Sequence, residues 1–125
     1  MTELLKGKRW DIVFNICEGI YGIGREAQVP CLLDAYRIPY TLSDPLVLSL
    51  TLNKGMTKSV IRDAGLDTPE FEIVYNEHDV NNNVNLSYPL FVKPNGEGSG
   101  MGIDYKSKVN NKLNLDIVLD NSNSI

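Results

Sequence analysis

Residues 91–103 read Phe-Val-Lys-Pro-Asn-Gly-Glu-Gly-Ser-Gly-Met-Gly-Ile: a lysine at the end of an apolar run, then four glycines and a serine. Glycine lets the backbone turn its N–H groups toward one point, because no Cβ blocks positive φ or close approach. Such N–H groups bind anions, and Lys93 adds a full positive charge. The stretch predicts a loop that holds nucleotide phosphates, with a glycine-rich β-hairpin and a surface lysine as the alternative. It is neither a P-loop, since the lysine precedes the glycines, nor a Rossmann fingerprint.

The composition is that of a soluble globular protein. The 125 residues fit one ordinary domain, and 42% of them are hydrophobic and 22% charged. A net charge of −4 argues against a nucleic-acid partner, which usually needs a basic surface. No apolar run approaches the ~20 residues that span a bilayer, and the polar N-terminus is not a signal peptide. We expect no membrane partner.

The two cysteines point to neither metal nor disulfide chemistry. Cys17 and Cys31 form no Cys-x-x-Cys pair and do not adjoin the single histidine, His78. We therefore expect no zinc site and no disulfide framework, and a reducing, cytoplasmic location.

The first part of the chain predicts a βαβ unit. Residues 11–16 are short, β-branched and aromatic, as in a buried strand, and a glycine turn follows them. From Arg25 onward, apolar residues recur with the spacing of an amphipathic helix: Val29, Leu32, Leu33 and Tyr36. Residues 38–41 then predict a short extended piece. Strand, helix and strand in this order are typical of a parallel sheet with helices packed on it.

Two helices are expected next. Asp44 and Pro45 open a short helix over residues 46–50. A second helix begins after Asn53 and ends at Gly65, with its apolar side formed by Met56, Val60 and Ile61.

The last part predicts a small antiparallel sheet. Residues 71–75 and 89–93 are expected strands, and residues 102–105 are the expected hairpin partner of 89–93. Residues 76–87 predict a surface loop, and residues 108–119 a helix. Because the organisation changes near residues 45–53, the predicted fold class is an α/β unit followed by an α+β unit.

Five motifs between residues 11 and 103 carry a family resemblance. They are Glu18-Gly19 through Gly24-Arg25-Glu26-Ala27-Gln28, residues 38–44, residues 50–54 with Thr57-Lys58, residues 64–69, and residues 91–102. Each motif is weak alone, but the ordered series resembles D-alanine–D-alanine ligase-like members of the ATP-grasp superfamily.

The resemblance implies a fold in two parts. Residues 1–50 would be the C-terminal part of a Rossmann-like pre-ATP-grasp domain, and residues 51–125 an incomplete N-terminal ATP-grasp subdomain, a helix with a small antiparallel sheet. The second ATP-grasp subdomain, which holds the family's magnesium ligands, has no counterpart in the sequence. We therefore expect a partial chain that supplies one jaw of the ATP site and is inactive alone. Its expected partner is the missing ATP-grasp half or a second copy in a homodimer.

The resemblance also implies a chemistry. Such ligases use ATP and Mg2+ to phosphorylate a carboxylate, and an amine then attacks the acyl phosphate. Lys93 and Lys54 match the family's phosphate lysines. A mobile flap would close over the phosphates with Glu97, Gly98, Ser99, Gly100 and Met101, and Ser99 would also face the transferred group as a catalytic residue. No metal ligand is expected in this chain.

The residues alone leave non-functional alternatives open for two of these positions, Lys54 and Glu97. They favour a solvated first-turn lysine at Lys54, and Lys58 is expected to be solvated whatever the function. Glu97 either orients the loop or is a surface acid of the hairpin.

Departures from the family pattern concern the substrate side. Glu18-Gly19 stands where the characterised ligases usually have His-Gly, and Gly24-Arg25-Glu26 where they usually have Gly-Glu-Asp. Glu18 and Arg25 either meet a substrate other than D-alanine or pair with each other. The expected substrates are ATP with an amino acid or small carboxylate. A non-catalytic nucleotide-binding or partner-binding module, or a remnant with no stable fold, are the alternatives.

Overall fold

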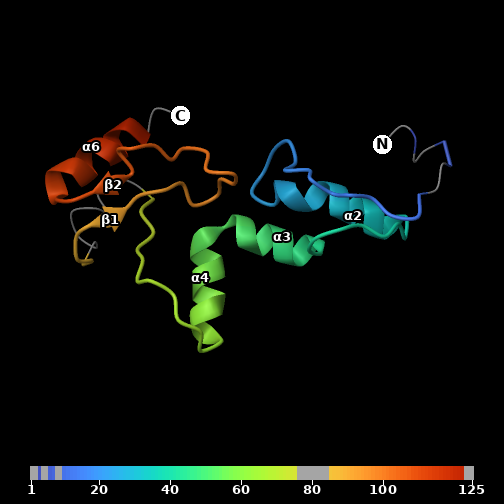
Figure 1. Cartoon of the computed structure of the whole chain (residues 1–125), viewed down its shortest axis with the longest axis horizontal. Helices are drawn as coiled ribbons and strands as arrows, with labels where there is room; N and C mark the ends of the chain where they lie inside the picture. The colour runs from blue at the N-terminus through green and yellow to red at the C-terminus, as the bar shows by residue number, and fades with distance from the viewer. Residues whose placement is uncertain (1–2, 4–5, 8–9, 76–84, 123–125) are drawn as a thin grey trace. The chain divides into compact units, whose positions relative to one another are not determined.

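The computed structural model describes residues 3, 6–7, 10–75 and 85–122. The chain forms two compact units, Met1–Asn53 and Lys54–Ile125. Figure 1 shows the elements in chain order: η1 (Arg25–Ala27), α2 (Gln28–Ala35), α3 (Pro45–Leu52), α4 (Lys54–Asp63), β1 (Leu90–Phe91), β2 (Lys108–Val109) and α6 (Lys112–Ser122). Within the described residues this is a small mixed fold of four α-helices, one 3-10 turn and a two-stranded antiparallel sheet. None of these described helices has the length and apolar character needed to cross a bilayer.

The core of the first unit lies where η1 packs against α2 and α3. The predicted helix after Arg25 is confirmed, since η1 runs directly into α2. Its buried side differs from the predicted stripe: Leu33 is buried, but Tyr36 is 49% exposed. The remaining core is formed by Ala27, Pro30, Ile38 and Leu52.

The predicted first strand is reduced to a single parallel bridge between Val13 and Tyr40. Val13 N donates to Pro39 O at 2.8 Å, and Thr41 N donates to Val13 O at 3.0 Å. The parallel direction agrees with the predicted βαβ unit. The prediction that residues 11–16 are buried is wrong, because Phe14 and Ile16 are 74% and 75% exposed. Among the described residues, no second layer covers them.

The start of α3 is the predicted one. Asp44 Oδ1 accepts from Val47 N at 2.9 Å, and Pro45 occupies the first helical turn. The carboxylate satisfies an N–H group that the helix itself leaves without a partner, and proline lacks the N–H that would need one.

The end of α4 is also as predicted. Gly65 has a φ of 76°, its N–H donates to Arg62 O at 3.0 Å, and Leu66 N donates to Ile61 O at 3.1 Å. These two bonds form a Schellman motif, for which glycine is favoured because it has no Cβ. The predicted apolar side is only partly buried, since Ile61 is half-buried but Met56 and Val60 are 56% and 51% exposed.

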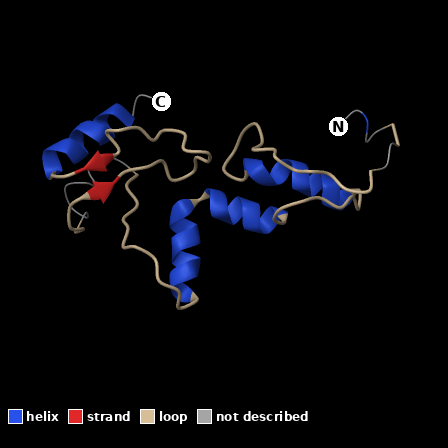
Figure 2. Ribbon diagram, viewed as in Figure 1, coloured by secondary structure: helices blue, strands red, loops and turns tan. Residues whose placement is uncertain are grey.

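The sheet of the second unit pairs different residues from those expected. Leu90 lies opposite Val109 and Phe91 opposite Lys108, so the partner of β1 is β2 and not residues 102–105 (Figure 2). Val92 N continues the pairing by donating to Ser107 O at 2.8 Å. Residues 102–105 lie in the loop between the two strands and do not pair with β1.

Two further predictions need correction here. Residues 71–75 form no strand. The helix expected over residues 108–119 begins only at Lys112, because Lys108 and Val109 pair with β1. The predicted surface loop over residues 76–87 lies mostly outside the described residues.

Val109 and Leu115 form the buried core of the second unit. Burial of such a side chain contributes about 1.5–3 kcal/mol. Four partly buried side chains pack around this pair: Val74, Leu90, Val92 and Val118.

Candidate functional site

The base of the glycine loop, residues 93–103, is closed by two residues. A β-carbon built on Gly102 would lie 2.5 Å from Pro94 Cγ, so only glycine permits this approach. Gly102 also has a φ of 71°, in the left-handed region that favours glycine. The two ends of the loop are therefore in contact, and the residues between them project as a closed turn.

The tip of the loop is built from two successive turns. Met101 N donates to Gly98 O at 2.9 Å, and Ile103 N donates to Gly100 O at 3.2 Å. Ser99 and Gly100 both have positive φ, 50° and 76°. Among the described residues, no backbone carbonyl accepts a hydrogen bond from the N–H of Gly98 or Gly100. Successive N–H groups in such turns are suited to binding an anion.

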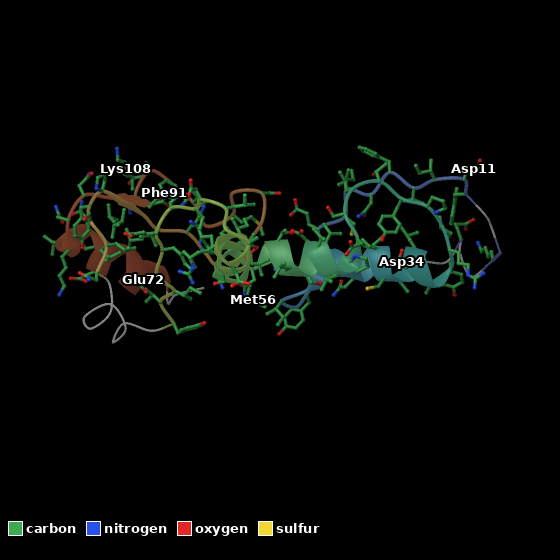
Figure 3. The ribbon with its side chains drawn as sticks, turned by 90° about the horizontal axis from the view of Figure 1, so that it is seen from below. Asp11, Asp34, Met56, Glu72, Phe91 and Lys108 are labelled. Carbon is green, nitrogen blue, oxygen red and sulfur yellow. The ribbon has the colours of Figure 1, made fainter. Side chains whose placement is uncertain are left out.

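Lys93 leaves the sheet at the start of this loop. Leu90 and Val92 turn toward the core, whereas Phe91 and Lys93 are exposed on the other side. This is the period-two alternation of a strand. Figure 3 shows Phe91 beside Lys108 of the neighbouring strand. The lysine is thus presented to solvent next to the glycine turns.

Lys54, at the first position of α4, contacts the same loop from 43 residues away in sequence. Its ammonium Nζ donates to the carbonyl oxygen of Glu97, and its backbone N–H donates to Asn95 O at 3.0 Å. Figure 1 shows this end of α4 beside the loop between β1 and β2. Lys54 is therefore not the solvated lysine that the residues alone favoured.

Asn95 is a residue of the site that sequence reasoning missed. Its Oδ1 accepts from Gly55 N at 2.8 Å, so it satisfies a second N–H group at the start of α4. Gly55 is buried, and a β-carbon there would overlap Cδ1 of Ile73. An asparagine beside glycines was a signal for a turn, but its helix partner lies 40 residues away.

Lys58 is not solvated, contrary to expectation. Its Nζ donates to Thr68 Oγ1 at 3.1 Å and to Pro69 O at 2.9 Å, and lies 5.2 Å from the centroid of the Phe71 ring. These contacts fasten the chain after α4 back onto the helix. Lys58 therefore has a structural role within the second unit.

The predicted substrate-side residues lie in the first unit, in one compact turn. Gly19 has a φ of 76°, and a β-carbon on it would overlap the carbonyl oxygen of Arg25. The segment carrying Glu18 thus lies against the backbone of Arg25. Gln28 stabilises the turn through its side chain: its Oε1 accepts from Ile20 N at 3.3 Å and its Nε2 donates to Tyr21 O at 2.7 Å.

One tyrosine of the first unit has a shifted pKa. Partial burial, followed by a hydrogen bond and the negative charge of Asp34, raises the pKa of the Tyr40 phenol above its ordinary value. Tyr40 belongs to the motif of residues 38–44 and pairs with Val13.

The part of the chain that the structure describes offers no group of three or more His, Cys, Asp or Glu side chains that could hold a metal ion. We name no metal ligand among these residues.

The comparisons with known proteins agree with the motif series. A family model described as the D-ala D-ala ligase C-terminus matches residues 60–124, which include the glycine loop. The D-alanine–D-alanine ligase of a Wolbachia species is 34% identical over 102 residues, which cover 82% of this chain and 30% of that protein. The corresponding ligase of Aquifex aeolicus is 37% identical over 93 residues, 74% of this chain and 31% of the ligase.

An uncharacterised protein of Sinorhizobium fredii is similar to the same degree. It is 38% identical over 92 residues, which cover 74% of this chain and 27% of that protein. The chain thus spans about 30% of the length of the curated relatives it matches.

Proposed function

This chain belongs to the D-alanine–D-alanine ligase family, and we propose that it supplies the phosphate-binding jaw of an ATP-dependent carboxylate–amine ligase. The observation that carries the proposal is the hydrogen bond from Lys54 Nζ to Glu97 O. It brings a cation from the start of α4 to the glycine loop that begins at Lys93. Two lysines and a set of backbone N–H groups would then bind an anion at the same loop.

The residues fit the triphosphate of ATP. Phosphoryl transfer needs little covalent chemistry from the protein, which acts mainly by positioning and by neutralising charge. Lys54 and Lys93 would offset the charge of the phosphates. The N–H groups of Gly98 and Gly100 would donate to phosphate oxygens, and the flap from Glu97 to Met101 would close over them.

The expected reaction joins a carboxylate to an amine. Transfer of the terminal phosphoryl group of ATP to the carboxylate gives an acyl phosphate and ADP. The amine then attacks the acyl carbon, and phosphate leaves. Ser99 is the residue that we place beside the transferred group, because its exposed side chain lies at the tip of the loop.

The substrate side is assigned to the turn around Glu18 and Arg25. We propose that these two charged residues meet an amino acid or another small carboxylate. The assignment of residues 1–50 to the pre-ATP-grasp domain and of residues 51–125 to the first ATP-grasp subdomain is part of the same proposal, as is a cytoplasmic location. Magnesium would be held by residues that we do not identify in this chain.

Calorimetric titration with MgATP tests the proposal on the intact protein that carries this chain together with the second ATP-grasp subdomain, because this chain supplies one jaw only. Lys93→Ala removes a charge-assisted contact worth about 1.5–3 kcal/mol, which is roughly ten- to 150-fold in ATP affinity. Lys108→Ala is the matched control, because Lys108 is an exposed lysine on the neighbouring strand. Failure of the wild type to bind ATP overturns the proposal, and equal binding by wild type and Lys93→Ala overturns the role of Lys93.

Measurement of ATP turnover distinguishes a ligase from a non-catalytic nucleotide-binding module. A ligase should release ADP and phosphate only when the right amino acid is present. ATP binding without turnover across a broad panel of amino acids and dipeptides would favour the module.

A further inference from the structure

Asn95 joins the glycine loop to the start of α4 through both its backbone and its side chain. Asn95 O accepts from Lys54 N at 3.0 Å, and Asn95 Oδ1 accepts from Gly55 N at 2.8 Å. Two residues further along the loop, Glu97 O accepts from Lys54 Nζ. Three hydrogen bonds therefore connect the first two residues of α4 with two residues of the loop.

The side-chain bond of Asn95 has the chemistry of a helix cap. The first N–H groups of an α-helix have no partner within the helix and need an acceptor from elsewhere. Here the acceptor comes from 40 residues away in sequence, inside the candidate phosphate loop. Any change in the position of Asn95 would therefore shift the first turn of α4, which carries Lys54.

The helix turn that receives this cap is packed closely against its own unit. Gly55 is buried, and a β-carbon on it would lie 3.4 Å from Asn95 Oδ1 and 3.0 Å from Ile73 Cγ1. The absence of a side chain at Gly55 makes room for Ile73, whereas Asn95 Oδ1 would lie at an ordinary contact distance from a β-carbon. The spacing between Lys54 and the glycine turns is thus fixed by local contacts within one unit.

We propose that Asn95 is a positioning residue: it fixes the position of the Lys54 ammonium relative to the glycine loop, as phosphate binding requires. The proposal rests on the function proposed above, in which Lys54 and the loop bind ATP. Asn95 acts through Lys54 and needs no contact with the nucleotide itself. Its effect on ATP affinity should therefore disappear when Lys54 is absent.

A double-mutant cycle on the whole protein, read by MgATP titration, tests this. Groups within one hydrogen-bond network couple strongly, so Asn95→Ala should lower ATP affinity by about 10-fold in the wild type. In the Lys54→Ala background the same change should cost less than about 2-fold, whereas in the Lys93→Ala background it should retain its full effect.

A second helix cap in the same unit supplies the structural control. Asn111 Oδ1 accepts from Asn114 N at 3.0 Å at the start of α6. Asn111→Ala removes a comparable cap and should leave ATP affinity unchanged. If Asn95→Ala does not fold, Asn95→Gln takes its place in the cycle, because it displaces the amide oxygen by one methylene.

The outcomes separate this proposal from the proposed function. If the wild type binds ATP and Lys54→Ala binds it more weakly, but Asn95→Ala binds like the wild type, the positioning role is wrong and the phosphate site stands. An equal loss from Asn95→Ala with and without Lys54 also overturns the positioning role. Failure of the wild type to bind ATP overturns both.

Discussion

A β-carbon added to Gly55 would overlap Cδ1 of Ile73 and lie 3.0 Å from its Cγ1. We therefore expect Gly55→Ala to destabilise the protein. Overpacking costs about 1–3 kcal/mol, whereas alanine recovers at most about 1 kcal/mol through its higher helix propensity. Urea denaturation of the variant and the wild type measures the difference.

Ile73→Val provides the matched control for this prediction, because it removes Cδ1 alone. In the Ile73→Val background, Gly55→Ala should cost clearly less than in the wild type. The same cost in both backgrounds would show that Ile73 is not what excludes a side chain at Gly55.

The base of the glycine loop gives a second stability prediction. Gly102→Ala should lower the stability of the protein for two reasons. The left-handed φ costs a residue with a β-carbon about 1–2 kcal/mol. Overpacking against the ring of Pro94 adds about 1–3 kcal/mol. Gly100 has a similar φ of 76°, and the described atoms leave open space around its β-carbon position. Gly100→Ala should therefore show only the first penalty in chemical denaturation. Equal losses for the two variants would contradict a tight contact between Gly102 and Pro94.

Features encoded within a few residues were predictable from the sequence. The cap of α3 needs only Asp44, Pro45 and Val47, and the end of α4 needs only Gly65 and its neighbours. The turns of the glycine loop are equally local, whereas its binding of phosphate stays a prediction. In each case the chemistry of the side chain, or its absence, determines the backbone.

Features that depend on distant contacts were not predictable in this way. The partner of β1 was misplaced because the pairing of Leu90 with Val109 joins residues far apart in the chain, and no local pattern marks that register. Asn95 was missed because no local pattern marks a cap for a helix 40 residues away. The approach of Lys54 to the loop was expected from the family resemblance, and not from the residues themselves.

The pKa of Tyr40 leads to a prediction about pH. Burial and Asp34 raise this pKa, so the folded state holds the phenol proton more tightly than the unfolded state does. The resulting stabilisation is present below the unfolded pKa of about 10 and is lost as the pH rises through the higher folded pKa. Asp34→Asn should lower the Tyr40 pKa, because it removes the nearby negative charge.

Phenolate absorbance during an alkaline titration measures this shift. The signal of Tyr40 is isolated by subtracting the titration curve of Tyr40→Phe, both in the wild type and in the Asp34→Asn variant. Identical Tyr40 curves in the two backgrounds would rule out an influence of Asp34.

Lys58 and Phe71 connect α4 to the chain that follows it. Lys58→Ala removes the hydrogen bonds to Thr68 Oγ1 and Pro69 O together with the contact to the ring. We expect it to lower the free energy of unfolding by about 1–2 kcal/mol. The loss is smaller than for a fully buried lysine because solvent screens this half-buried side chain. Lys93→Ala, at an exposed lysine, should change this free energy by less than about 0.5 kcal/mol.

Phe71→Leu isolates the contribution of the ring to this connection. It keeps an apolar side chain but removes the π-system that Lys58 approaches to 5.2 Å and Arg62 to 5.7 Å. A double-mutant cycle of Lys58→Ala with Phe71→Leu, read by urea denaturation, should give a coupling of about 0.5–1 kcal/mol. A coupling of zero would assign the whole effect of Lys58 to its two hydrogen bonds, which tie α4 to the backbone after Gly65 without help from the ring.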